Sequence, residues 1–288
     1  MDDVLNKYYD YLKYELNYSD LTISDYQQHL GKYKEYLNER KLNYLKVNKD
    51  DVIEMLKYLD GLKLSNRTIS NVLSALRSFY NYLLDEGIIE TNIFKLVSNP
   101  KLEKKLPNFL SYEDLRTIIE SIKTDNPLGL RNRLIIELLY ATGMRVSELV
   151  NLKVDDFNFD DQSIRIFGKG RKERIVYYGE YAKDVLIQYL QSKNTNSEYL
   201  ILNNKGEKIT TRGVEKIVDK VVNEACINNN VTPHTFRHTF ATHLLNTGCD
   251  IKSVQELLGH SSLNTTEIYT HITNDYLKSE YLKSMPRW

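Results

Sequence analysis

The sequence predicts a mainly α-helical protein with a small antiparallel β-sheet, divided into two domains. Apolar residues recur every three or four positions from the start to about residue 98, which is typical of amphipathic helices. Two runs rich in β-branched and aromatic residues, Ser163 to Phe167 and Arg174 to Tyr178, flank a glycine-containing segment and predict a hairpin. Between these regions, the stretch 99–107 (NPKLEKKLP) has the proline and charge content of an extended linker.

Residues 1–98 are expected to form the first domain, with four helices. Apolar spacing indicates each helix, and side chains that cap helix N-termini mark where most of them begin. The expected helices are Asp3 to Leu16, Thr22 to Arg40, one opened by Asn48 with Asp51, and one from Ser65 or Asn66 to Leu84.

A linker over residues 99–110 and a second domain over residues 111–288 follow. Ser111 with Asp114 predicts a capping box, and helices run to about Ala141. A third strand is expected around residues 199–202. Helices return from Thr211 and are interrupted at 228–230, Gly248 and Gly259.

The composition excludes several classes of protein. With 288 residues, the chain has room for one large domain or two of ordinary size. No apolar run approaches the ~20 residues of a membrane-spanning helix, and the N-terminus lacks the basic and apolar parts of a signal peptide. We therefore expect a cytoplasmic protein without a membrane partner. Two cysteines supply neither a disulfide framework nor a cysteine-based zinc site.

Positive charge is concentrated locally, although the chain has no net charge. The 39 basic and 39 acidic residues are weak evidence against a nucleic-acid partner. Residues 163–178 nevertheless hold five basic side chains against Glu173 alone. Polar and basic residues between Arg67 and Asn81 recur at helical spacing, so this face either contacts phosphates or is a solvated polar stripe.

The stretch 231–238 (VTPHTFRH) is a candidate oxyanion site. Thr232 is a good N-cap and Pro233 suits the first helical position, so His234 and Arg237 lie one turn apart at a helix start. Unpaired backbone N–H groups point the same way. Because arginine grips phosphate with two parallel donors, phosphate is the commonest candidate ligand.

Two further stretches hold candidate residues. In 141–149 (ATGMRVSEL), Gly143 ends one helix and Arg145 begins the next, where Glu148 can accept a hydrogen bond and hold the local geometry. Lys169 stands between glycines at the hairpin tip, which either lets the backbone approach a ligand closely or makes a solvated loop.

One chemistry accounts for these residues together with the stretches 257–260 (LLGH) and 268–271 (IYTH), although tyrosine identity alone does not show which of the 22 tyrosines would react. Two arginines can neutralise the non-bridging oxygens of a phosphodiester as it becomes pentavalent. A lysine can protonate the departing 5′-oxygen, and a histidine can help deprotonate a tyrosine for in-line attack. Tyrosine, with a pKa of ~10, needs such cationic neighbours to react at neutral pH. The reaction needs no metal, cofactor or nucleotide.

At these residues the sequence resembles the tyrosine site-specific recombinases, or phage integrase family, and most closely their short Xer-like branch. The motifs agree with the family in order, spacing and flanking residues. They are 141–149, 168–170 (GKG), 233–243 (PHTFRHTFATH), 257–260 and 268–271.

The resemblance implies a catalytic role for six residues. These roles are Tyr269 as the nucleophile that forms a 3′-phosphotyrosyl bond, Arg145 and Arg237 as the phosphate clamp, Lys169 as the general acid, His234 as acid/base partner, and His260 as a hydrogen-bond donor to phosphate.

The resemblance also implies the architecture and the partners. Residues 1–98 would be a SAM-like core-binding domain and residues 111–288 the catalytic domain, closing round duplex DNA. Four protomers would act on two DNA sites with paired inverted repeats, and the last helix, around residues 274–284, would dock on a neighbour. A second recombinase or an activator can also take part. The role would be chromosome-dimer resolution, DNA inversion, or integration and excision of an element, at the nucleoid.

Three alternatives remain open from the sequence. A type IB topoisomerase-like enzyme would use similar chemistry without exchanging strands. A metallohydrolase is suggested by His234 and His238 at i and i+4, but a threonine stands where a zincin has glutamate, and Arg237 would oppose the cation. A DNA-binding protein without catalysis requires the whole residue set to be coincidence.

Overall fold

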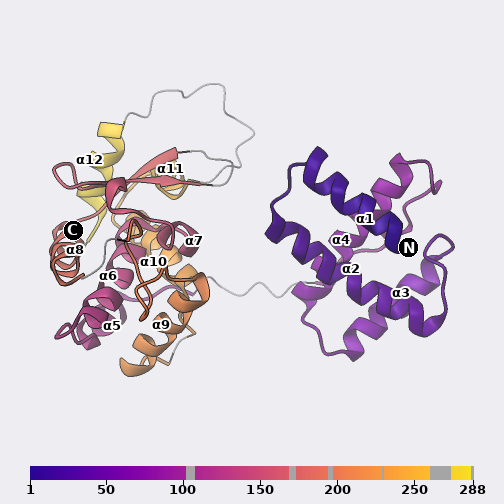
Figure 1. Ribbon diagram of the computed structural model, residues 1–288, viewed down its shortest axis with the longest axis horizontal. Coiled ribbons are helices and arrows are strands. Elements are labelled where there is room, and N and C mark those ends of the chain that lie inside the picture. The colour runs from indigo at the N-terminus through magenta and orange to yellow at the C-terminus, as the bar shows by residue number, and fades with distance from the viewer. Residues whose placement is uncertain (102–107, 169–172, 194–196, 229, 260–273, 287–288) are drawn as a thin grey trace. The chain divides into compact units, whose positions relative to one another are not determined.

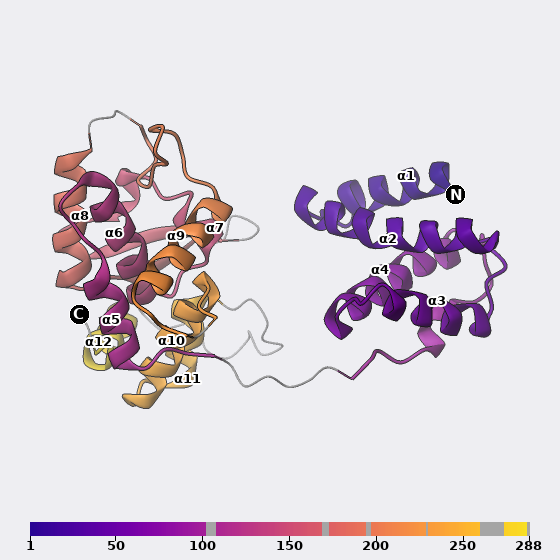
Figure 2. The ribbon, with the colours of Figure 1, turned by 90° about the horizontal axis from the view of Figure 1, so that it is seen from below.

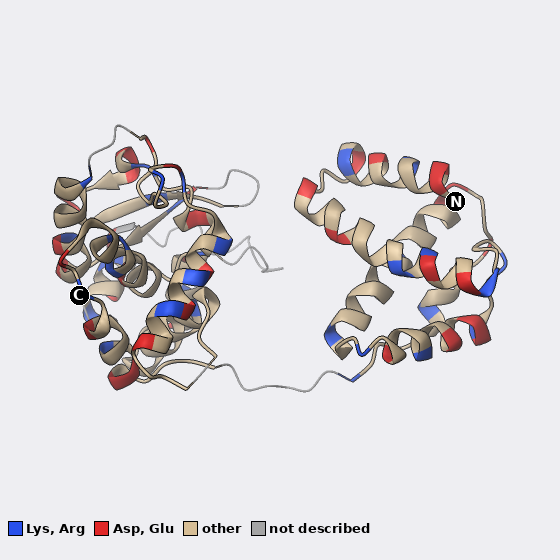
Figure 3. Ribbon diagram, turned by 60° about the horizontal axis from the view of Figure 1, so that its bottom comes forward, with Lys and Arg blue, Asp and Glu red and all other residues tan. Residues whose placement is uncertain are grey.

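The structure is a computed structural model that describes residues 1–101, 108–168, 173–193, 197–228, 230–259 and 274–286. It contains two compact units, Met1–Lys105 and Leu106–Trp288, each with its own hydrophobic core (Figure 1). Acidic and basic residues are interspersed along the helices of both units (Figure 3). Among the described residues, no helix is both long and apolar enough to cross a membrane.

The first unit is built around helix α4 (Figure 2). The helix expected over residues 3–16 is α1, which then changes pitch into a π-helical turn, η1. The buried face of α4 packs on α2, α3 and η2. The bounds are α1 (Asp2–Asp10), η1 (Tyr11–Glu15), α2 (Asp20–Arg40), α3 (Lys49–Gly61), α4 (Asn66–Asp85) and the 3-10 turn η2 (Ile93–Leu96).

Side-chain caps fix where these helices begin, because they satisfy backbone N–H groups that lack a helical partner. Ser19 accepts from the N–H of Thr22 at 3.2 Å, so α2 begins earlier than the expected cap at Thr22. Asn48 and Asp51 form the predicted capping box at the start of α3. Ser65 is the cap of α4.

Tyrosines form much of the core of this unit. The hydroxyls of Tyr33 and Tyr80 lie 2.6 Å apart, and Tyr80 donates to the carbonyl of Tyr44 at 2.6 Å. The ring of Phe94 packs edge-on against both Tyr33 and Tyr80. Packing of this kind explains why a chain can carry 22 tyrosines without most of them being reactive.

The second unit surrounds the buried helix α6, against which α5, α8, α9 and α10 pack. Asn126 caps α6, and Gly143, with φ +59°, ends it in the left-handed conformation that the sequence predicted. The bounds are α5 (Tyr112–Ser121), α6 (Pro127–Thr142), α7 (Val146–Leu149), α8 (Glu180–Ser192), α9 (Thr211–Glu224), α10 (Pro233–Asn246) and α11 (Ile251–Leu258).

The sheet has three antiparallel strands in the order β1 (Phe157–Asn158), β2 (Ser163–Phe167), β3 (Glu173–Tyr177). The mainly helical fold with a small antiparallel sheet and the β2–β3 hairpin are confirmed. The prediction of a third strand at 199–202 is wrong. Tyr199 and Leu202 form only isolated bridges, because their neighbours in space belong to irregular chain outside the sheet.

The last helix, α12 (Asn274–Ser284), packs against α10, α11 and β3 of its own unit. Tyr281 is fully buried there, and Thr247 donates to the carbonyl of Ser284 at 2.6 Å. The helix expected to dock on a neighbouring protomer therefore covers its own unit in this structure.

Gly143→Ala is expected to destabilise the second unit. An added Cβ would lie 2.4 Å from Phe240 Cδ1 and 2.9 Å from Leu258 Cδ2, at a φ that favours glycine. We expect the free energy of unfolding to fall by about 2–4 kcal/mol, measured by urea denaturation.

Gly31→Ala in α2 is the matched control, because its Cβ would meet nothing within 4 Å. This replacement should leave stability unchanged or raise it by about 0.5–1 kcal/mol. Equal effects of the two replacements would contradict the strain at Gly143.

Candidate active site

Arg145 stands at the junction between α6 and α7. Its backbone N–H donates to Glu148 Oε2 at 2.7 Å, which is the role the sequence predicted for Glu148. Its guanidinium Nη1 lies 3.1 Å from Glu148 Oε1. The side chain of Arg145 is still 39% exposed, so a ligand can reach it from solvent.

His234 and Arg237 both lie at the start of α10, which begins as predicted. Thr232 accepts from the N–H of Thr235 at 3.4 Å, and Pro233 occupies the first helical position. The side chain of His234 is exposed, whereas Arg237 is only 8% exposed. His234 and Arg237 therefore differ in solvent exposure, although they lie one turn apart.

Arg237 reaches into the region of Arg145. It donates from Nη1 to the carbonyl of Gly143 and from Nη2 to the carbonyl of Leu258, both at 2.7 Å. Burial, and then the charges of Arg145 and Arg174, lower the pKa of Arg237 to about 10. The group therefore stays protonated at neutral pH.

Three successive carbonyls at the C-terminal end of α11 each accept a hydrogen bond from a different arginine. Such carbonyls lack a partner within the helix and carry the negative end of its dipole, so they favour cations. The bonds are Arg174 Nε to Leu257 at 3.2 Å, Arg237 Nη2 to Leu258 at 2.7 Å, and Arg145 Nη2 to Gly259 at 3.4 Å.

This cluster of Arg145, Arg174, Arg237 and Glu148 is suited to bind an anion. Three guanidinium groups and one carboxylate give a net charge of 3 − 1 = +2. Guanidinium donors match the geometry of phosphate oxygens, and their charge acts strongly where water is partly excluded. The cluster can therefore hold a phosphodiester and the extra charge of its transition state.

The structure brings together two of the six predicted site residues, Arg145 and Arg237, and places His234 one turn before Arg237. Lys169, His260 and Tyr269 lie outside the described residues. In the sequence, Gly168 directly follows β2 and Lys169 comes next. His260 directly follows Gly259.

Arg174 also belongs to the arginine cluster, although in the sequence it is only one residue of a basic run. In the hairpin it pairs with Ile166, and directly opposite residues of antiparallel strands share a face. Ile166 is 2% exposed, so Arg174 belongs to the inward face. In the sequence, Ile164 and Ile166 alternate with Arg165, and pairing this strand with the next in a hairpin is the signal that could have found it.

His243, the last residue of the 233–243 motif, has a structural role. Its ring nitrogens lie 3.0 Å from the Tyr140 hydroxyl and 3.0 Å from the carbonyl of Leu110. The bond to a carbonyl requires a proton on Nε2, so Nδ1 accepts from Tyr140. Thr239 accepts from the Leu110 N–H at 3.0 Å, so α10 holds both backbone groups of Leu110.

The polar face of α4 is only partly available to DNA. Arg77 donates to two backbone carbonyls and to Asn99 in the segment from η2 onward. Arg67, Asn71 and Ser74 are exposed. The phosphate-contact hypothesis therefore applies to these three residues.

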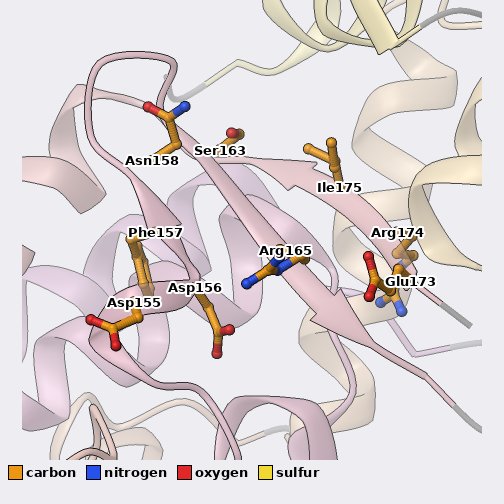
Figure 4. A pocket seen from close by; sticks show the side chains of 9 residues that line it. All are labelled: Asp155, Asp156, Phe157, Asn158, Ser163, Arg165, Glu173, Arg174 and Ile175. Carbon is orange, nitrogen blue, oxygen red and sulfur yellow. The ribbon is translucent and has the colours of Figure 1, made fainter. Parts of the chain in front are cut away.

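A hollow over the sheet contains none of the predicted site residues that the structure describes (Figure 4). Its lining comes from η3 (Val154–Asp156) and the three strands. Arg174 of the cluster lines it together with Arg165, and Asp155, Asp156 and Glu173 also line it, so charges of both signs are present. The arginine cluster at α11 is the better candidate for an anion site.

Segments in both units of the chain match known protein families. Residues 108–275 match the phage integrase family, and residues 5–87 match the phage integrase N-terminal SAM-like domain. The chain belongs to the phage integrase family.

Relatives within this family are similar over nearly the whole chain. Tyrosine recombinase XerC of Anoxybacillus flavithermus (strain DSM 21510 / WK1) is 44% identical over 292 residues, covering 98% of this chain and 97% of the relative. Tyrosine recombinase XerC of Bacillus pumilus (strain SAFR-032) is 42% identical over 294 residues, covering 99% and 96%.

Solved structures of recombinases share the fold. The XerH site-specific recombinase bound to palindromic difH substrate, in a post-cleavage complex, is 30% identical with a TM-score of 0.75, covering 96% of this chain and 82% of that chain. These similarities confirm the prediction of a Xer-like tyrosine recombinase. The enzyme cleaves and rejoins DNA in site-specific recombination by means of a tyrosine.

The burial of His243 predicts a pH dependence of stability. Burial lowers its pKa in the folded protein. As the pH falls through the ordinary histidine range near ~6.5, the unfolded chain takes up the proton first, so stability decreases. We expect His243→Gln to be less stable than the parent at pH 8. Between pH 7 and pH 5, its free energy of unfolding, measured by urea denaturation, should fall by less than that of the parent.

His238→Gln on the same helix is the control, because the side chain of His238 is exposed. It should leave the pH profile of the parent unchanged. If His243→Gln loses as much stability between pH 7 and pH 5 as the parent does, the buried imidazole of His243 is not the cause of the pH dependence.

Proposed function

We propose that this recombinase cleaves DNA by in-line attack of the Tyr269 hydroxyl oxygen on the scissile phosphorus. The new bond joins this oxygen to the 3′-phosphate, and the bond from phosphorus to the 5′-oxygen breaks. Arg145 and Arg237 bind the non-bridging oxygens and neutralise the charge of the pentavalent transition state. Attack by a free 5′-hydroxyl on the phosphotyrosine reverses the step, so rejoining consumes no nucleotide.

Three other side chains hold or move protons in this proposal. Lys169 gives a proton to the departing 5′-oxygen, His234 exchanges a proton with the Tyr269 hydroxyl, and His260 donates a hydrogen bond to a phosphate oxygen. Their positions in the matching motifs support these roles. The step is balanced by these side chains alone, without a metal or another cofactor.

The observation that carries the proposal is the meeting of Arg145 and Arg237 at neighbouring carbonyls of α11. Both guanidinium groups are already fixed by the protein, so little side-chain entropy remains to be lost when a phosphate binds. The net positive charge of the cluster favours the state in which phosphate carries most negative charge. This is the preference that lowers a reaction barrier.

We infer further that residues 1–98 and 111–288, joined by the linker 99–110, both bind one DNA duplex. The match of residues 5–87 to the N-terminal SAM-like domain of phage integrases supports this division. Two protomers related by two-fold symmetry would occupy paired inverted repeats. Exchange between two duplexes requires cleavage of four strands, so four protomers would act together, and α12 would leave its own unit to dock on a neighbour.

Covalent capture tests the nucleophile. The full chain is incubated with genomic DNA fragments from the organism that encodes it, and DNA that stays attached to protein in SDS is sequenced. We expect adducts enriched in paired inverted repeats. Tyr269→Phe removes one oxygen, so it should give no adduct while retaining DNA binding in a gel shift.

Tyr181→Phe is the control, because Tyr181 is an exposed tyrosine on α8. It should form the adduct as the parent does. An adduct formed by Tyr269→Phe would refute the proposed nucleophile. Recombinant products from plasmids with two captured sites are expected, whereas relaxation of one-site plasmids without exchange would indicate a topoisomerase.

Arg145→Ala should lower the single-turnover cleavage rate by ~10²-fold or more, as do other losses of a transition-state anion contact. The rate is measured on a nicked duplex that carries one half-site identified by covalent capture. Cleavage releases the fragment that begins with the free 5′-hydroxyl. Arg116→Ala is the control, since the Arg116 side chain is 73% exposed on α5. A loss of tenfold or less in Arg145→Ala would mean that the phosphate lies elsewhere.

A further inference from the structure

We propose that Arg174 is a positioning residue for the phosphate site, because it binds the carboxylate of Glu148 and thereby leaves the guanidinium of Arg145 free to grip DNA. This inference rests on the proposed roles of Arg145 and Arg237. It assigns a specific function to an arginine that the proposed reaction does not otherwise use.

The first support is where Arg174 lies. It is an arginine on the inward face of the hairpin, paired with buried Ile166, and its side chain is only 12% exposed. A buried charge is costly unless it is paired and hydrogen-bonded. Among the described residues, Arg174 meets this condition through Glu148 and the carbonyl of Leu257.

The second support is the geometry around Glu148. Arg174 binds both carboxylate oxygens, with Nη1 at 2.8 Å from Oε1 and Nη2 at 2.8 Å from Oε2. Arg145 has a longer contact, with Nη1 at 3.1 Å from Oε1. The two-pronged bond, which is the stronger arrangement, therefore belongs to Arg174. The side chain of Arg145 remains 39% exposed.

Without Arg174, the carboxylate would turn to the one remaining guanidinium. Burial by itself would raise the pKa of Glu148, but the hydrogen bonds from Arg174 and from Arg145 hold it below the ordinary value, so the group is ionised. A buried carboxylate that has lost one cation would bind the other more closely. Arg145 would then be neutralised by Glu148 in place of a phosphate.

The third support is contact with the end of α11. Arg174 Nε donates to the carbonyl of Leu257, and a Cβ added to Gly259 would lie 2.9 Å from Arg174 Cδ. Gly259 therefore permits close packing of the arginine stem against the helix end. The same helix end binds Arg145 and Arg237, so Arg174 also fixes the support on which both rest.

Arg174→Lys is the principal test, because it keeps the charge and removes the planar fork. We expect the half-site dissociation constant to change less than twofold and the single-turnover cleavage rate to fall about tenfold or more. Arg133→Lys is the control, since Arg133 and Glu137 form a comparably buried pair with side chains 18% and 2% exposed. It should lower thermal stability as much and leave the cleavage rate unchanged.

A double-variant cycle separates positioning from loss of structure. Arg174→Met leaves Arg145 as the remaining guanidinium partner of Glu148, whereas combining it with Glu148→Gln removes the charge that would neutralise Arg145. We expect the double variant to cleave faster than Arg174→Met alone. A double variant that is slower than Arg174→Met overturns the proposal.

The outcomes also distinguish this inference from the proposed function. If Arg145→Ala abolishes cleavage and Arg174→Lys cleaves at the parental rate, the reaction scheme stands and the role of Arg174 is wrong. If Arg145→Ala cleaves normally, the reaction scheme itself is wrong. An equal loss in Arg174→Lys and Arg133→Lys would mean that Arg174 acts only on stability.

Discussion

The candidate site depends on the C-terminal end of α11, where three consecutive carbonyls accept hydrogen bonds from Arg174, Arg237 and Arg145. Without an acceptor of this kind, three guanidinium groups would repel one another and separate into solvent. The helix end supplies partial negative charge in fixed positions and leaves the arginines charged. The end of one short helix therefore determines how β3, α10 and the α6–α7 junction meet.

The same arrangement is the physical basis of the proposed preference for an anion. Glu148 offsets only part of the positive charge, and the neighbouring cations help to lower the pKa of Arg237. A phosphate that enters relieves this repulsion, and a transition state with more negative charge relieves it further. Stabilisation of the transition state depends on rigid support as much as on charge, because guanidinium groups that had to reorganise would stabilise it less.

Local signals predicted the elements that carry the site but not the contacts between them. Gly143 and Gly259 both end helices in the left-handed conformation, and Thr232 caps α10, because each feature depends on neighbours a few residues away. The strand expected at 199–202 failed for the opposite reason. Apolar residues are buried there, but a strand also needs a partner at matching register, which only the tertiary fold supplies.

Arg174 shows the same limit within the arginine cluster. In the sequence it is one of five basic residues in a hairpin, and its bond to Glu148 spans 26 positions of chain. Counting charge cannot reveal that it is turned inward and paired. The equal totals of 39 basic and 39 acidic residues mislead in the same way, because a phosphate responds to the few charges that are close and poorly screened. A chain without net charge can therefore act on a polyanion when its arginines converge on one helix end.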